Sequence, residues 1–201
     1  MIRVLLAEDQ RMMRGALAQL LDLERDIEVV AETGSGDEVL PLALRHRPDV
    51  AVLDIEMPVR SGLEAAADLR DDLPDCRVLI VTTFGGPGHL RRALQVGASG
   101  FLAKDGPVGR LAEAIRRVKQ GEQAIDPALA VDALTLAPCP LTNREREVLV
   151  VAADGAPVAE LAQRLCLSER TVRNHLSAAI QKTGARNRME AVAKARHNGW
   201  L

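Results

Sequence analysis

Aromatic residues, clustered cysteines and long hydrophobic runs are scarce in this 201-residue chain. It contains two Phe, one Trp and no Tyr, so Leu, Val, Ile and Ala must fill any core. The three cysteines are far apart and lack metal-ligand spacing with the four histidines, which indicates reduced thiols rather than disulfides or a zinc site. No stretch approaches the roughly 20 apolar residues that span a bilayer, and no cleavable signal follows the short N-terminal apolar run. We therefore expect a cytoplasmic protein with no membrane partner.

Charge is distributed unevenly along the chain. The net charge is only -2, and the proportions of hydrophobic (47%) and charged (27%) residues are those of an ordinary globular protein. From Cys139 onward, however, 10 Lys and Arg oppose 6 Asp and Glu, whereas residues 1–138 carry 16 against 22. We expect an anionic partner for the C-terminal part alone. The length fits two small domains, each able to bury its own core.

Short apolar runs alternate with longer amphipathic stretches over residues 1–121. The runs are IRVLLA, IEVVA, VAVLD, RVLIVTT and GFLA, and a stretch with helical spacing follows each of them. Five strand-helix units predict an α/β fold, a doubly wound five-stranded parallel sheet with helices on both faces. Strand signals stop after Gly121, and a proline-containing stretch over 122–139 is predicted to be a linker. Residues 140–201 show only helical patterns and predict an all-α four-helix domain.

Polar side chains follow four of the apolar runs. Glu8 and Asp9 follow the first run and Asp54 ends the third, while Thr82 and Lys104 belong to the ends of the fourth and fifth. The carboxyl ends of parallel strands meet at one edge of a sheet, so these side chains should share a crevice. Three close carboxylates repel one another, and Mg²⁺ or Mn²⁺ would relieve that repulsion. Asp54 could then attack a phosphoryl group whose oxygens Thr82 and Lys104 contact.

The segments AEDQ, LDIEMP, SGLEA, VTTF and GASGFLAKD, in this order and spacing, resemble a response-regulator receiver of the NarL/FixJ class. The resemblance covers residues 1–121 and implies a flavodoxin-like fold with Asp54 as the phosphoacceptor. It also implies a metal held by Glu8, Asp9, Asp54 and the backbone carbonyl of Glu56. The residues implied to sense or bind the phosphoryl group are Thr82, Phe101 and Lys104.

Three further positions affect what this resemblance implies. Asp105 stands where many receivers have Pro, and without proline a cis peptide after Lys104 would cost about 2.5–4 kcal/mol. Phe101 fits either a switch aromatic that turns inward on activation or an ordinary core residue, and both interpretations stay open. Phe84 lies two residues beyond Thr82, where an apolar ring is expected to slow hydrolytic loss of phosphate.

The segment LSERTVRNHLSAAIQKTG predicts a helix with one apolar stripe. Val172, Leu176, Ala179 and Ile180 recur at helical spacing, whereas basic and amide side chains occupy the other face. A shorter amphipathic segment, VAELAQRLC, precedes it, and a tight turn at 167–168 would join the two as a helix-turn-helix. Arg, Asn and Lys side chains can contact base edges or phosphates in the major groove.

The pattern from LTNREREVL to the last helix resembles the LuxR-type helix-turn-helix that accompanies NarL/FixJ receivers. The resemblance implies that Arg173, Asn174 and Ser177 lie near base edges and that Thr171 and Lys182 lie toward phosphates. It further implies that the last helix, Arg188 to Asn198, pairs two subunits. Thr142 with Glu145 forms a capping-box pattern, and Ser168 is an expected N-cap.

Together the two resemblances imply a two-component response regulator. A sensor histidine kinase would phosphorylate Asp54, and the protein would then form a homodimer, bind double-stranded DNA and regulate transcription, with RNA polymerase as a further candidate partner. The receiver would catalyse only its own phosphorylation and dephosphorylation and would not be an enzyme toward outside substrates. One alternative is a phosphorylation-independent transcription factor of the same architecture. The other is a metal-dependent phosphohydrolase, for which Glu56 is the only nearby water-activating candidate.

Overall fold

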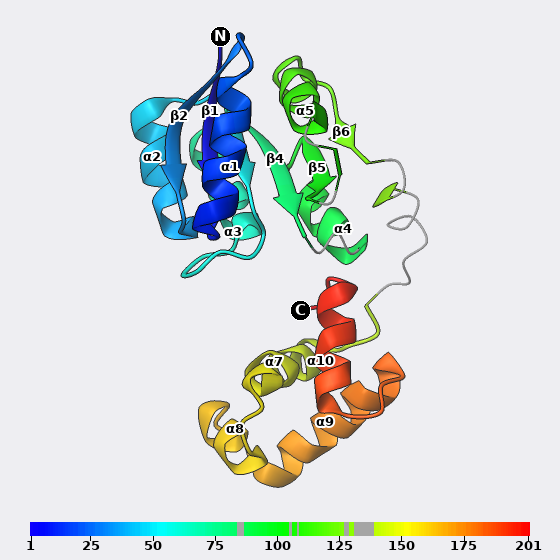
Figure 1. The fold of residues 1–201 in the computed structure, drawn as a ribbon. Coiled ribbons are helices and arrows are strands. Elements are labelled where there is room, and N and C mark those ends of the chain that lie inside the picture. The colour runs from blue at the N-terminus through cyan, green and yellow to red at the C-terminus, as the bar shows by residue number, and fades with distance from the viewer. Residues whose placement is uncertain (84–86, 105, 108, 127–128, 131–138) are drawn as a thin grey trace. The chain divides into compact units, whose positions relative to one another are not determined.

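The computed structural model describes residues 1–83, 87–104, 106–107, 109–126, 129–130 and 139–201, which form two compact units (Figure 1). Most of residues 1–131 belong to the first unit, and residues 132–201 belong to the second. Phe84 and Asp105, on which two of the sequence expectations depend, lie outside the described residues. Within the described ranges, none of the helices has the length and apolar character needed to cross a membrane.

The first unit is built on a parallel sheet whose strand order is β2-β1-β3-β4-β5-β6. The chain therefore passes from β1 outward to β2, and then crosses to β3 on the other side of β1. The strands are β1 (Ile2–Ala7), β2 (Ile27–Thr33), β3 (Val50–Leu53), β4 (Arg77–Thr82), β5 (Gly100–Ala103) and β6 (Ala124–Ile125). The predicted parallel α/β architecture is confirmed, but the predicted strand count of five is wrong.

The sixth strand, β6, lies inside the stretch that the sequence indicated as linker. Gly100 pairs with Ala124 and Phe101 with Ile125, and the Ala124 amide donates to the Ser99 carbonyl at 3.0 Å. A two-residue strand is too short to show the alternation by which strands are recognised in a sequence. It forms because the outer edge of β5 has backbone groups that need partners. The linker prediction is therefore wrong for residues 124–125.

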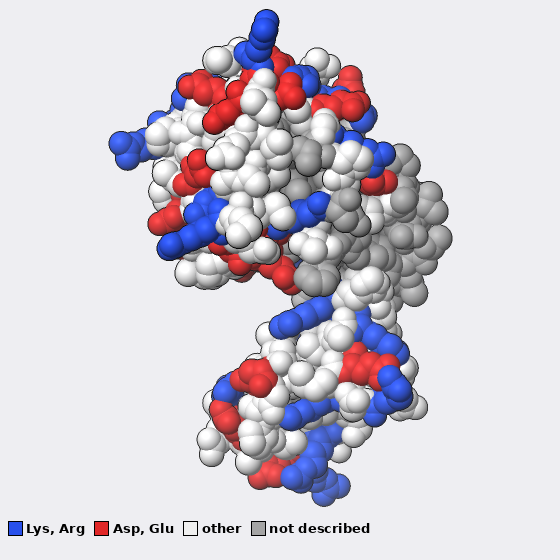
Figure 2. Space-filling view, in the orientation of Figure 1, with Lys and Arg blue, Asp and Glu red and all other residues white. Residues whose placement is uncertain are grey.

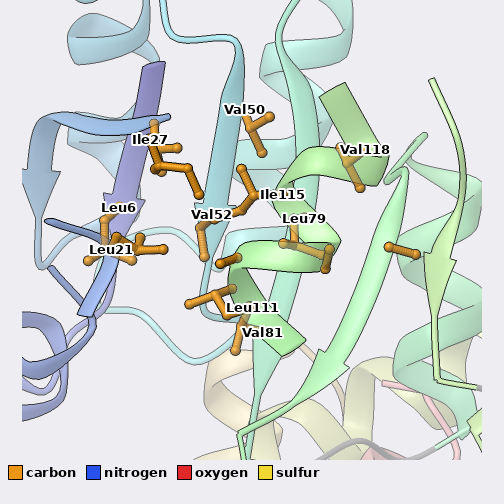
Figure 3. Packing of buried hydrophobic residues seen from close by; sticks show 14 of the residues in the cluster. Leu6, Leu21, Ile27, Val50, Val52, Leu79, Val81, Leu111, Ile115 and Val118 are labelled. Atoms are coloured by element: carbon orange, nitrogen blue, oxygen red, sulfur yellow. The ribbon is translucent and has the colours of Figure 1, made fainter. Parts of the chain in front are cut away.

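Helices cover both faces of this sheet. On one face, α1 (Arg11–Asp22) and α5 (Gly109–Lys119) enclose a cluster in which Leu6, Val52, Leu79 and Ile115 are at most 1% exposed (Figure 3). On the other face lie α2 (Val39–His46) and α3 (Gly62–Asp72) (Figure 1). Helix α4 (Pro87–Gln95) follows β4, and a short 3-10 helix (Gly36–Glu38) precedes α2. Each buried Leu, Ile or Val contributes about 1.5–3 kcal/mol, so aliphatic packing replaces the missing aromatics.

The second unit is the predicted four-helix domain. Its helices are α7 (Asn143–Val151), α8 (Val158–Arg164), α9 (Glu169–Thr183) and α10 (Arg188–His197). The helix ends agree with the sequence signals: Thr142 and Glu145 form a capping box, and the Ser168 side chain accepts from the Thr171 amide. Gly184 ends α9 at a φ of 59°, in the left-handed region that glycine tolerates.

Candidate functional site

Backbone hydrogen bonds carry the ladder of the sheet one residue beyond β3 and β5 and fix the backbone of the polar residues there. The Asp54 amide donates to the Ala7 carbonyl at 2.9 Å, and the Lys104 amide donates to the Thr82 carbonyl at 2.9 Å. Asp54 therefore follows β3 directly beside β1, at the point where the chain reverses its direction across the sheet. This is the position at which open α/β sheets bind ligands.

Glu8, Asp54 and Lys104 form a buried ionic cluster at this edge. The Lys104 Nζ lies 2.6 Å from Glu8 Oε2 and 2.9 Å from Asp54 Oδ2, and the three side chains are only 6%, 2% and 5% exposed for Lys104, Glu8 and Asp54. Asp9 is exposed and completes a group of three carboxylates, each of which offers one oxygen within 4.8 Å of those of the other two. Three carboxylates and one ammonium have a formal charge of -2, so this donor set fits a hard divalent cation.

The electrostatics of the cluster reflect its burial. Burial raises the pKa of Glu8, although Lys104 opposes that shift. Burial alone would lower the pKa of Lys104, but its contacts with Glu8 and Asp54 outweigh this effect and raise the pKa. Lys104 therefore stays protonated at neutral pH and holds a fixed positive charge between the two carboxylates.

The other predicted receiver residues lie as follows. Thr82 is buried at the last position of β4, on the same edge as Asp54 and Lys104. Phe101 is fully buried in β5 between Ile80 of β4 and Ile125 of β6 in the strand register, a placement compatible with both interpretations of this residue. The Glu56 side chain is exposed, so its backbone carbonyl remains the predicted contribution to a metal site.

A close backbone approach at Gly62 is a feature of the site that residue chemistry alone did not identify. A Cβ atom at Gly62 would lie 1.9 Å from the Asp54 carbonyl oxygen. Gly62 begins α3, and the preceding Ser61 caps the helix in a capping box with Glu64. The S-x-x-E signal of that box was visible in the SGLEA segment. The cap and the glycine together hold the start of α3 against the backbone of Asp54.

A second candidate site lies on α9. Val172, Leu176 and Ala179 are buried against the domain, while Arg173, Asn174 and Ser177 are exposed on another side of the helix. Lys and Arg side chains gather at the end of the C-terminal unit where Figure 1 places the start of α9, as Figure 2 shows. The α8–turn–α9 arrangement thus presents an exposed polar helix face of the kind that enters a major groove.

Several basic and hydroxyl side chains of this unit form contacts within the unit. Arg173 forms an ion pair with Glu169 at 2.6 Å, and the Thr171 hydroxyl contacts the Ser168 hydroxyl at 2.8 Å. Lys182, predicted to lie toward phosphates, contacts Glu145 of α7. Arg188, at the start of the helix predicted to pair subunits, donates to the carbonyls of residues 155 and 156. It therefore fixes the segment that leads into α8.

Comparisons with known proteins show which families the two units resemble. Residues 4–116 match the family of response regulator receiver domains, and residues 139–195 match the bacterial regulatory proteins of the luxR family. The chain is similar to the transcriptional regulatory protein DesR of Bacillus subtilis, with 44% identity over 201 residues and complete coverage of both chains. It is 45% identical to the uncharacterised transcriptional regulatory protein YvfU of the same organism, again over the full length of both.

A solved structure extends the comparison. The response regulator ChrA of a heme-sensing two-component system is 32% identical, with a TM-score of 0.59 and coverage of 100% of this chain and 98% of ChrA. The receiver match alone spans more than half of the chain. The chain therefore belongs to the response regulators that join a receiver domain to a luxR-type DNA-binding domain and act in transcriptional regulation.

Proposed function

We propose that Asp54 is the phosphoacceptor of this response regulator and that its phosphorylation controls DNA binding. The observation that carries the proposal is the buried cluster in which Asp54 shares Lys104 with Glu8, beside the exposed carboxylate of Asp9. A buried carboxylate held by a lysine at a sheet edge has a defined orientation, as a nucleophile requires. A solvated acid at the end of a strand would have neither the burial nor the lysine contact that orients Asp54.

In the proposed reaction, a carboxylate oxygen of Asp54 attacks the phosphorus of a phosphohistidine on a sensor histidine kinase. A P–O bond forms as the P–N bond breaks, and the imidazole nitrogen keeps the bonding electron pair. Glu8, Asp9, Asp54 and the backbone carbonyl of Glu56 would hold Mg²⁺ or Mn²⁺, which supplies charge neutralisation at the phosphoryl oxygens. Lys104 then exchanges a carboxylate contact for a phosphoryl oxygen.

The proposed response begins with Thr82, whose hydroxyl donates to a phosphoryl oxygen, and with Phe101 in the neighbouring strand. We propose that the receiver then forms a homodimer and that α10 pairs the DNA-binding units. In each unit, Arg173, Asn174 and Ser177 read base edges while Thr171 lies toward the backbone of the DNA. The excess of basic residues after Cys139 favours this polyanionic partner. RNA polymerase is a further proposed partner, and the cytoplasm is the proposed location.

An outside phosphoester is a weaker candidate substrate. Repeated hydrolysis would need a group beside Asp54 that activates water, and the exposed side chain of Glu56 is not held in the buried cluster. Among the residues that the structure describes, the carboxylate group consists of Glu8, Asp9 and Asp54. We therefore propose a single phosphoryl group per chain, whose addition and loss the receiver itself catalyses.

Incubation with acetyl phosphate and Mg²⁺ tests the acceptor. The wild-type chain is expected to gain one phosphoryl group, measured as an intact mass, because a small phosphodonor can reach the nucleophile without the kinase. Asp54→Asn should gain none. The matched control is Asp22→Asn, which removes an exposed carboxylate at the end of α1 and should be phosphorylated as the wild type is. Equal phosphorylation of Asp54→Asn would refute the assignment.

A further inference from the structure

Glu145 is the most deeply buried charged residue of the described DNA-binding unit. It lies in the first turn of α7 and is only 5% exposed. A carboxylate removed from water is costly unless it is paired and hydrogen-bonded. The buried Glu145 carboxylate therefore requires a charged or hydrogen-bonding partner.

The partner is Lys182, in the last turn of α9. Its Nζ lies 2.8 Å from both Oε1 and Oε2 of Glu145. The same carboxylate accepts a hydrogen bond at 2.7 Å from the backbone amide of Thr142, the N-cap residue of α7. Burial acts to raise the pKa of Glu145, but Lys182 and the cap outweigh this and lower it, so the carboxylate is charged at neutral pH. One carboxylate thus joins the start of α7 to the end of α9.

This link adds a directional contact to the apolar packing of α9 that the described residues show. Val172, Leu176 and Ala179 attach α9 to the domain core, and such contacts are largely non-directional. An ion pair in which the Lys182 ammonium contacts both carboxylate oxygens adds a constraint on the rotation and depth of α9 at one end of the helix. The recognition of bases depends on the rotation and depth of α9, because binding groups must lie within about 0.5 Å of their productive positions.

We propose that Lys182 is a positioning residue of the recognition helix, acting through Glu145, and not a phosphate-binding residue. The inference rests on the proposed binding of DNA by α9. Its electrostatic basis is that the Lys182–Glu145 pair has no net charge, so it adds little to the neutralisation of phosphates. Its geometric basis is that two of the three Nζ donors of Lys182 are directed at the carboxylate.

The test is a salt titration of DNA binding by the phosphorylated full-length chain. The probes are a duplex selected from genomic DNA by that chain and a scrambled duplex of the same length. Loss of a phosphate contact weakens binding to both duplexes alike. It also reduces, by about 1, the slope of the logarithm of the binding constant against the logarithm of the salt concentration. For Lys182→Met we instead expect a loss of about tenfold on the selected duplex, as when one base contact is lost, little change on the scrambled one, and an unchanged slope.

Variants of the partner distinguish the two roles further. Glu145→Gln keeps the capping geometry but removes the charge, and it should reproduce the loss of specificity. The double variant should bind the selected duplex about as well as the single variant with the lower affinity. Each substitution removes the same interaction, so their effects should not add. Arg146→Met, which removes an exposed charge one residue away on α7, is the matched control and should bind as the wild type does. A slope reduced by about 1 in Lys182→Met, with normal specificity in Glu145→Gln, would overturn the proposal.

Melting temperatures of the same variants separate this inference from the proposed function. The losses in Lys182→Met and Glu145→Gln should not add in the double variant if the pair holds α9 on α7. Additive losses contradict the positioning role whatever the DNA result. If the wild type selects no duplex, the DNA-binding function itself fails, and non-additive melting still supports the structural link.

Discussion

Replacing Gly62 with alanine is expected to lower the free energy of unfolding by about 2–3 kcal/mol and to slow phosphorylation of Asp54. The added Cβ would lie 1.9 Å from the Asp54 carbonyl oxygen and 2.8 Å from its carbonyl carbon. Both are backbone atoms and cannot rotate away, so α3 and the end of β3 must separate. A displacement of about 1 Å can cost a reaction roughly a hundredfold in rate. Chemical denaturation and the rate of phosphorylation by acetyl phosphate measure the two effects.

The matched control for this substitution is Gly15→Ala in α1. A Cβ atom at Gly15 meets nothing within 4 Å, and alanine in a helix interior is favoured over glycine by about 0.8–1 kcal/mol. Gly15→Ala should therefore stabilise the protein and leave phosphorylation unchanged. A Gly62→Ala variant with the stability and phosphorylation rate of the wild type would contradict the close approach of α3 to Asp54.

Replacing Lys104 with methionine is expected to lower the free energy of unfolding by about 3–5 kcal/mol at neutral pH in the absence of divalent cations. The substitution leaves Glu8 and Asp54 buried beside each other without their ammonium partner. Mg²⁺ should restore part of the loss, because a cation held by the same carboxylates replaces the missing charge. Denaturation with and without Mg²⁺ measures both effects.

The control for Lys104 is Lys119→Met. Lys119 contacts Asp49 at 2.5 Å, but its side chain is 46% exposed. Exposed ion pairs contribute about 0–1 kcal/mol, so this variant should lose little stability and should not respond to Mg²⁺ differently from the wild type. Similar losses of unfolding free energy in the two lysine variants would contradict the claim that Lys104 stabilises buried carboxylates.

The sequence predicted the parts of the fold that depend on periodic patterns. Apolar runs of strand length located β1 to β5, and the ends of those runs placed Glu8, Asp54 and Lys104 at one edge of the sheet. Capping signals such as Thr142 and Ser168 depend on residues three positions apart, so they were also visible. Local patterns therefore predicted both the elements and the edge on which the site lies.

The features that the sequence did not predict depend on contacts between distant segments. β6 has two residues, which are recognised as a strand only through their pairing with β5. Lys182 has the chemistry of a phosphate contact, and its pairing with Glu145, 37 positions earlier, depends on how α9 packs against α7. No helical pattern reports such a pair. The double contact of Lys104 with Glu8 and Asp54 was likewise invisible, although the proximity of these residues was expected.

DNA affinity measured with and without phosphate on Asp54 tests the central claim most directly. The measurement uses fluorescence anisotropy at one salt concentration, with the selected duplex and full-length chains treated identically with acetyl phosphate and Mg²⁺. The wild type should bind at least about fivefold more tightly after treatment, the lower end of typical coupling between two sites. Asp54→Asn should show no gain, and Asp22→Asn should respond as the wild type does. Equal affinity of treated and untreated wild type, or a full gain in Asp54→Asn, would contradict control of DNA binding through Asp54.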